Sequence, residues 1–262
     1  MVMKNPLAWL ALIVVLGGGY AVWRWYDAQA PQPAPAVATA PSPPPAPAEA
    51  PKIAHPLPEP PPGSPPLPTL ADSDAAAREA LARLFGSESV ANYFNTDGAI
   101  RRFVATVDNL PRKTTAARLM PVKPVPGAFA VTGSGDAFAM TSQNPLRYRP
   151  YIVAMEAADA KRLVATYVQL YPLFQSAYQE LGYPNGYFND RLIVAIDDLL
   201  ATPDVATPRL AQPKILYEFA DQALEERSAG QKMMLRMGSA NATRVKEKLR
   251  AIRRELVAAG PS

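Results

Sequence analysis

The sequence predicts a mainly α-helical globular domain with a small β-hairpin, preceded by one transmembrane helix and a disordered proline-rich linker. Three observations predict this organisation. An uncharged apolar run covers Leu7–Trp23, proline is dense from Pro31 to Pro68, and apolar residues recur at helical spacing after Thr69. We therefore expect an N-terminal tail (1–6), a transmembrane anchor (7–26), a proline- and alanine-rich linker (31–68) and a globular, mainly helical domain (69–262).

The apolar run is at the lower limit for a membrane-spanning helix, since about 20 residues are needed to cross roughly 30 Å of hydrocarbon. Aromatic rings between Tyr20 and Tyr26 suit the headgroup region, and Arg24 can extend into it. A cleaved signal peptide is the alternative, because Ala28-Gln29-Ala30 resembles a cleavage site. Pro31 directly after that site, and the length of the run, favour an uncleaved anchor.

The linker contains 17 of the chain's 30 prolines. Proline fixes φ and lacks a backbone N–H, so helix and sheet are disfavoured and extended polyproline II is expected. The simplest interpretation is a spacer. A docking peptide remains the alternative, because proline-rich segments fit aromatic grooves.

Helical periodicity is the main signal in the globular domain. It predicts helices over 77–85, 100–110, 159–181 and 192–200, then two C-terminal helices separated at Gly238, the first starting near Ser228. Pro172 inside the third helix predicts a kink or a break, and Asn189 or Asp190 is expected to cap the fourth. Residues 128–131 and 137–141 flank a glycine-rich turn and predict a hairpin, and 214–219 could form a third strand.

The composition excludes several kinds of chemistry. There is no cysteine, and the single histidine, His55, lies in the linker, so thiolate catalysis, histidine triads and histidine-ligated metals in the domain are excluded. The chain contains no phosphate-binding or dinucleotide-binding glycine motif, and we expect neither a cofactor nor a metal. Carboxylate-only catalysis remains, with Glu180 and Asp190 as weak candidates, because glycoside cleavage requires only two carboxyl groups.

Two segments have the composition of recognition surfaces. The loop from Leu181 to Asp190 combines tyrosine rings with asparagine amides, which suits a glycan or a peptide. Arginines near 101–112 and 147–149 suit carboxylates or phosphates, although structural ion pairs would use the same residues. The candidate binding residues are Arg101, Arg102, Asn109, Arg112, Arg147, Tyr148, Arg149, Tyr183, Asn185, Tyr187, Asn189, Asp190 and Arg191.

The C-terminal region from Lys232 to Arg254 is strongly basic, with Glu247 as its one acidic residue. A basic helical face could lie on anionic lipid or on an envelope polymer. A solvated helix face is the simpler alternative.

Several long strings resemble a bacterial family of domains of unknown function, numbered 3014. They are Arg101–Arg112, Tyr171–Gln175 with its continuation to Pro184, Tyr187–Leu192 and Ser228–Lys232, and the resemblance covers about residues 67–257. It implies a bacterial, membrane-attached setting with an N-terminal anchor and a proline-rich arm. It implies no activity, ligand or catalytic residue.

The sequence thus favours a non-enzymatic envelope protein that binds a protein or a cell-wall polymer at a distance from the membrane. We expect a single-pass protein of the bacterial inner membrane, held in the bilayer by its N-terminal helix, with a periplasmic C-terminal domain and no nucleic-acid partner. The alternative is a carboxylate-dependent hydrolase or lyase that acts on an envelope glycan.

Overall fold

The computed structural model of the chain describes residues 52–59, 66–134 and 137–260. No helix within these ranges is both long enough and apolar enough to cross a membrane. The expected anchor (7–26) lies outside the described residues, as do positions 31–51 and 60–65 of the expected linker.

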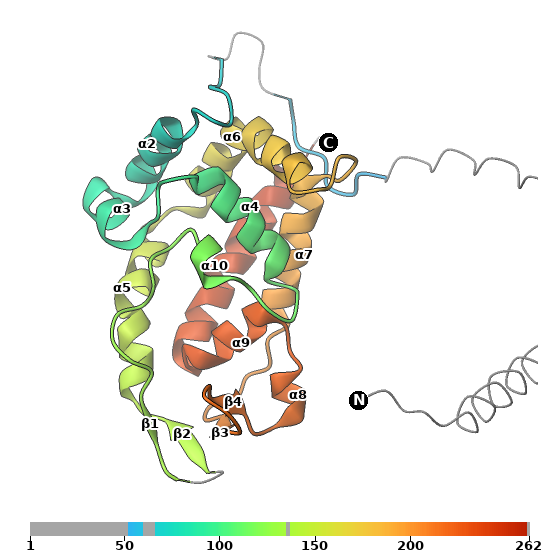
Figure 1. Cartoon of the computed structure of the whole chain (residues 1–262). Helices are drawn as coiled ribbons and strands as arrows, with labels where there is room; N and C mark the ends of the chain where they lie inside the picture. The colour runs from blue at the N-terminus through green and yellow to red at the C-terminus, as the bar shows by residue number, and fades with distance from the viewer. Residues whose placement is uncertain (1–51, 60–65, 135–136, 261–262) are drawn as a thin grey trace, which may run out of the picture. The chain divides into compact units, whose positions relative to one another are not determined.

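The described residues form a mainly helical domain with a small sheet (Figure 1). The helices are α2 (Asp74–Phe85), α3 (Ser87–Tyr93), α4 (Ala99–Asn109), the 3-10 turn η1 (Ala117–Leu119), α5 (Gln143–Ala157), α6 (Ala160–Glu180), α7 (Phe188–Leu200), α8 (Gln222–Glu225), α9 (Ala229–Arg236) and α10 (Ser239–Ala258). The strands are β1 (Val131–Thr132), β2 (Phe138–Met140), β3 (Arg209–Ala211) and β4 (Glu218–Phe219).

The main core lies between α2, α4, α6, α7 and α10. The apolar stripe expected on 159–181 is present in α6, where Leu170, Phe174 and Tyr178 are buried at four-residue spacing. Phe174 stacks on Phe188, the first residue of α7, with ring centroids 6.0 Å apart and an interplanar angle of 14°. These aromatic contacts fix the start of α7 against the middle of α6.

A second, smaller core lies under the sheet, at the opposite end of the domain from α2 (Figure 1). The strands form one antiparallel sheet in the order β1-β2-β3-β4, and its buried side chains include Leu210 and Phe219. The expected hairpin is therefore present as β1 and β2. β3 was not predicted, and the possible strand over 214–219 is limited to β4.

Two local predictions need correction. Neither Asn189 nor Asp190 caps α7, because the helix begins at Phe188 and its N-cap is Tyr187. The break that was one of the two outcomes expected at Pro172 is absent, because α6 continues as one helix through it and leaves the proline side chain exposed. An exposed position on an outer face leaves room for the ring on the side where proline removes a hydrogen bond.

Residues assigned to the end of the linker pack against the domain. Leu57 is 9% exposed, and Leu67 contacts the main core. Segment 52–59 also lies beside the end of α10 (Figure 1), where a β-carbon at Gly260 would be 3.2 Å from the carbonyl oxygen of Pro56. The ordered unit thus begins before Thr69.

Candidate functional site

The loop between α6 and α7 is held tightly on α6. Tyr183 stacks on Tyr178 with ring centroids 4.5 Å apart and an interplanar angle of 19°. A β-carbon at Gly186 would lie 2.8 Å from Cε1 of Tyr178 and 3.0 Å from Cβ of Tyr183, so only glycine permits this approach. The loop is therefore packed closely against α6, directly before the start of α7.

Gln175 in α6 connects this loop to α7. Its Nε2 donates to the carbonyl of Gly186 at 2.7 Å, and its Oε1 accepts from the backbone N–H of Phe188 at 2.9 Å. Tyr171, one turn earlier, donates its hydroxyl to the same Oε1 at 2.9 Å. These bonds place the first residues of α7 without a side-chain cap, which explains why Asn189 and Asp190 are available for other contacts.

Asp190 accepts hydrogen bonds from two consecutive backbone N–H groups of segment 52–59, which the sequence assigned to the linker. Its Oδ2 accepts from Ala54 at 3.0 Å, and its Oδ1 accepts from His55 at 2.7 Å. Beside it, Nδ2 of Asn189 donates to the carbonyl of His55 at 2.9 Å. All three bonds reach the main chain of the bound segment, which bends at Ala54 and His55, so they contact its backbone and not its side chains.

Tyr187 extends this recognition by two residues. Its hydroxyl accepts from the backbone N–H of Leu57 at 2.8 Å, and the Leu57 side chain is the one buried apolar group of segment 52–59. Pro56 and Pro58 alternate with it and have no N–H to satisfy. We call the surface formed by Tyr187, Asn189 and Asp190 the peptide groove.

Two tyrosines support the groove from beneath. The Tyr167 hydroxyl donates to Oδ1 of Asn189 at 3.2 Å, which orients the amide toward His55. The ring of Tyr171 packs against that of Tyr187 with centroids 5.4 Å apart. Burial raises the pKa of both Tyr167 and Tyr171 above the usual value for tyrosine, so both hydroxyls stay protonated donors.

A buried ion-pair cluster lies on the other side of the loop. Asp108, at the end of α4, has a side chain only 7% exposed, and it accepts from Arg112 at 2.8 Å and from Arg191 at 3.1 Å. The Tyr183 hydroxyl donates to the same carboxylate at 3.3 Å. The hydrogen bond to Asp108 and its charge raise the pKa of Arg112. Three predicted binding residues thus meet around one buried carboxylate, Asp108, which was not among the predicted site residues. They are Arg112, Tyr183 and Arg191.

The start of α9 completes this cluster from below. The backbone N–H of Ala229 donates to the carbonyl of Arg112 at 2.6 Å, and that of Gly230 to Leu110 at 2.9 Å. Ser228 caps α9 by accepting from the N–H of Gln231, in agreement with the predicted helix start near Ser228. The Gln231 side chain does not return to Ser228 and donates instead to Asp198.

The remaining predicted binding residues make internal contacts or are exposed. Arg101 pairs with Glu180 at 3.0 Å, Arg102 donates to the carbonyls of Asp97 and Arg118, Asn109 donates to Ala105, and Arg147 donates to the carbonyls of Pro126 and Gly127. Burial raises the pKa of Tyr148. Arg149 and Asn185 are exposed, and the structure does not bring either one to the groove.

The candidate catalytic carboxylates are also engaged. Glu180 is paired with Arg101, and both oxygens of Asp190 accept from segment 52–59. On α7, Asp197 pairs with Arg253 at 2.6 Å. Among the described residues, no cluster of three or more acidic or histidine side chains could hold a metal ion.

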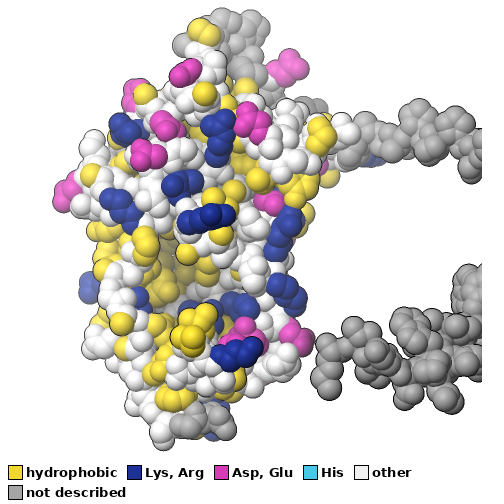
Figure 2. Space-filling view, in the orientation of Figure 1, with side chains coloured by type: hydrophobic (Ala, Val, Ile, Leu, Met, Phe, Trp, Pro, Cys, Tyr) yellow, Lys and Arg dark blue, Asp and Glu magenta, His cyan; other side chains and the backbone are white. Residues whose placement is uncertain are grey.

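The basic C-terminal region is largely occupied by contacts within the domain. Lys232 pairs with Glu225, Arg244 with Glu156, and Arg253 with Asp197, while Lys246 and Lys248 donate to backbone carbonyls. On the face drawn in Figure 2, Lys and Arg side chains are scattered among acidic ones and form no single patch. Internal contacts, which neither the membrane-binding face nor the solvated face anticipated, thus involve most of these charges.

The segment that occupies the groove was not predicted from the sequence. Ala54, His55 and Leu57 lie in a linker whose gaps are mostly filled by alanine, and the prolines drew attention away from them. The available signal was the pair of large apolar residues, Leu57 and Leu67, each between two prolines. A pure spacer has no need of buried leucines.

The fold and the site define a small helical domain that holds a proline-containing segment by its backbone. The chain belongs to the family described as "Protein of unknown function (DUF3014)", whose sequence model matches residues 99–253. The match includes the peptide groove and the Asp108 cluster but neither α2 nor segment 52–59. Neither a curated protein nor a solved structure matches the chain.

Proposed function

We propose that this chain is a membrane-anchored, non-enzymatic interaction module of the bacterial envelope whose groove binds proline-containing peptides by their backbone. The observation that carries this proposal is the capture of Ala54 and His55 by the carboxylate of Asp190. A groove that already holds such a segment has the donors, acceptors and shape to hold another of the same chemistry.

The hydrogen bonds to segment 52–59 support recognition of the order in which backbone N–H groups and prolines follow one another. Donors are used at Ala54, His55 and Leu57, whereas prolines occupy positions 56 and 58, where no donor is needed. Proline also restricts the free peptide to extended conformations, which lowers the entropy lost on binding. Hydrogen bonds to a charged acceptor contribute about 1.5–3 kcal/mol each, so two on one carboxylate provide a substantial part of the affinity.

The proposed tether is shorter than the whole proline-rich region. Because residues 52–59 contact the domain, the free spacer would extend from Pro31 to Pro51. At about 3.1 Å per residue in polyproline II, it would reach roughly 65 Å from the bilayer. The module would then sample partners within that distance of the membrane.

The glycan-cleaving alternative has no observation in its favour. Glu180 is neutralised by Arg101, and Asp190 has no free oxygen while the segment is bound. We therefore do not carry it further.

The binding test uses the full-length chain in detergent, with residues 52–59 replaced by glycine and serine to empty the groove. A fluorescein-labelled peptide of the native sequence Lys52–Glu59 is added, and its anisotropy is measured. Binding is expected to weaken at least tenfold with Asp190→Asn, and to be unchanged with Asp204→Asn, a change at an exposed carboxylate.

A second peptide makes the test specific for the backbone. N-methylation at His55 removes the N–H that Oδ1 of Asp190 accepts, without changing any side chain. We expect this peptide not to bind. The proposal fails if the emptied, folded chain does not bind the native peptide, or if it binds the N-methylated peptide equally well. Separately, a compartment-dependent reporter fused after Ser262 tests the periplasmic location.

A further inference from the structure

An apolar cavity of about 300 Å³ lies between α2, α4 and α6. α2 lines it with Leu81, Leu84 and Phe85 and with two small residues, Ala77 and Ala80, which leave space that larger side chains would fill. The opposite walls include Phe103 from α4 and Leu170 from α6. The cavity therefore adjoins the main core of the domain.

The lining presents almost only hydrocarbon. Among the polar residues there, Asn95 donates its amide to the carbonyls of Met120 and Val122, and Tyr167 donates its hydroxyl to Asn189. Their hydrogen-bonding groups are thus used within the protein. The space opens partly to the surface, and contiguous apolar surface in a concave site commonly marks a binding site. A space of this size and lining is suited to an apolar ligand.

The volume indicates how large that ligand is. A water molecule takes about 30 Å³ of liquid, and a methylene group is similar in size, so the cavity matches a chain of roughly ten carbons.

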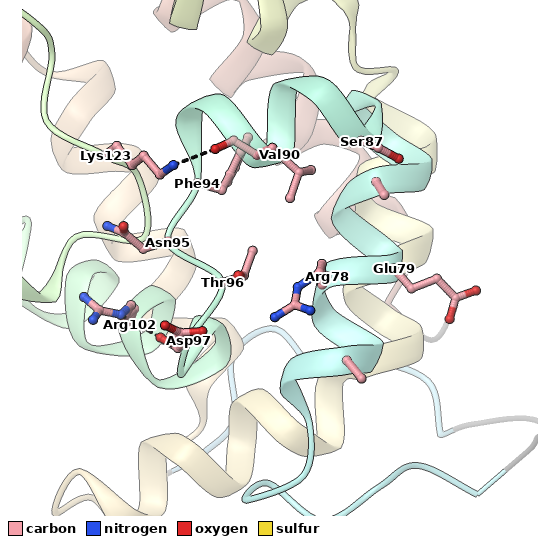
Figure 3. Close-up of a pocket in the computed structure, with 13 residues that line it drawn as sticks. Arg78, Glu79, Ser87, Val90, Phe94, Asn95, Thr96, Asp97, Arg102 and Lys123 are labelled. Carbon is pink, nitrogen blue, oxygen red and sulfur yellow. Dashed lines mark hydrogen bonds between the residues drawn. The ribbon is translucent and has the colours of Figure 1, made fainter.

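A second, more polar cleft of about 670 Å³ lies between α2, α3 and residues 94–97 (Figure 3). Phe94 and Asn95 line both spaces, so the apolar cavity and the polar cleft share a wall. Arg78 from α2 points into the cleft in Figure 3. Arg102 from α4 and Lys123 lie along its other sides.

None of these three cations pairs with a carboxylate in the described part of the chain. Arg102 donates to the carbonyls of Asp97 and Arg118, and Lys123 donates to the carbonyl of Ala91 at 2.5 Å. Two acidic residues also line the cleft, Glu79 and Asp97, and Glu79 is already paired with Arg83 at 2.5 Å. The cleft therefore keeps an excess of positive charge that an anionic group would balance.

We propose that this domain binds a single-chain anionic amphiphile, with its hydrocarbon chain in the apolar cavity and its charged head in the cleft. The chain passes beside Phe94, and the head group takes hydrogen bonds from Arg78, Arg102 and Lys123. A fatty acid and a lysophospholipid share this chemistry. This site shares Tyr167 with the residues that support the peptide groove, but its argument uses no groove residue and does not depend on the proposed function.

The test uses the full-length chain in nanodiscs of phosphatidylcholine, to which diazirine-labelled decanoic acid is added. After illumination, cross-linked peptides are identified by mass spectrometry, which locates the ligand even though free lipid is present. Cross-links are expected in α2 and in the part of α6 around Leu170. An absence of cross-links in both helices would overturn the proposal.

Two variants separate the parts of the site. Ala80→Phe fills the cavity and is expected to reduce cross-linking at least tenfold. Arg78→Glu, at an exposed position, reverses the charge of a residue proposed to bind the head group and leaves the core unchanged. It is expected to reduce cross-linking at least fivefold. Lys161→Glu makes the same charge change at an exposed position of α6 outside both spaces and should have no effect. Equal cross-linking in Arg78→Glu and Lys161→Glu would overturn the proposal, even if Ala80→Phe fails to fold.

Two further probes identify the head group. A diazirine-labelled lysophosphatidylglycerol tests whether a phosphate head is accepted, and preferential labelling by it or by the fatty acid supports the site and names its source. A diazirine-labelled monoacylglycerol has the same chain and no charge. If it labels α2 and α6 as strongly as the two anionic probes, the assignment of the cleft to an anionic head is wrong.

Discussion

Arg191 at the start of α7 donates through Nε to Oδ1 of Asp108 at the end of α4, at 3.1 Å. The Asp108 side chain is 7% exposed and that of Arg191 is 21% exposed, so the pair is largely shielded from water. Arg191 also donates to the carbonyl of Asp108. This pair connects two helices of the main core at the point where the loop before α7 folds back.

Asp108→Ala is expected to destabilise the domain by about 3–5 kcal/mol, because it leaves the shielded guanidinium of Arg191 without a counter-charge. Arg112→Ala removes the other partner of the same carboxylate, but Arg112 is 49% exposed, and we expect a loss below about 1 kcal/mol. Urea unfolding followed by circular dichroism measures both. Equal losses in the two variants would contradict the assignment of Asp108–Arg191 as the structural pair.

Asp190→Asn is expected to loosen the segment that occupies the groove. An amide can accept only one of the two N–H groups that the carboxylate accepts, and it carries no charge. Hydrogen exchange measured by mass spectrometry on a peptide covering 52–59 should be at least tenfold faster. Exchange in α10 should not change, and Asp204→Asn serves as the matched control. Unchanged exchange at 52–59 would show that Asp190 does not hold the segment.

The burial of Tyr167 and Tyr171 predicts a loss of stability at alkaline pH. Their pKa values are raised in the folded state, so the folded protein holds protons that the unfolded chain releases above about pH 10. The associated stability is fully present below that pH and falls as the pH increases further. Tyr171→Phe should unfold with a shallower loss between pH 9 and 11, measured as the urea midpoint. An identical pH dependence in the variant would count against this origin.

The sequence predicted those helices that bury one continuous stripe. α6 and α10 follow this rule. Phe174 in α6 and Leu256 in α10 each belong to a row of apolar residues at helical spacing on a single face. α5 was missed because its face pattern is weak, with Ile152 as its one buried apolar side chain, Leu146 and Val153 exposed, and Pro150 inside it. Packing from other elements, and not its own periodicity, stabilises α5.

The candidate site was predicted in part for a similar reason. Tyr187, Asn189 and Asp190 were identified by their chemistry, but the expectation that Asn189 or Asp190 caps α7 was wrong because Gln175 holds the helix start. Rules for helix caps consider only residues next to the helix end in sequence, whereas Gln175 lies on a different helix, α6. Asp108 was missed for the same reason, since one acidic residue in a helical stripe gives no sign that two arginines will cover it.

Gly230→Ala is expected to destabilise the domain, although alanine favours a helix by about 1 kcal/mol over glycine. A β-carbon at position 230 would lie 2.6 Å from Cδ2 of Leu199 and 3.2 Å from the carbonyl oxygen of Leu110. The same carbonyl accepts the N–H of Gly230 at 2.9 Å, so α9 cannot move away without losing that bond. Overpacking of this kind costs about 1–3 kcal/mol, which exceeds the gain in helix propensity.

A double-mutant cycle with Leu199→Ala tests the cause. Removal of the Leu199 side chain opens the space that the new methyl group needs, so Gly230→Ala should cost less in that background than in the native chain. The free energy of unfolding in urea gives all four corners of the cycle. If Gly230→Ala stabilises the native chain, α9 does not depend on close backbone approach, and the contact between α9 and the Asp108 cluster is looser than its hydrogen bonds indicate.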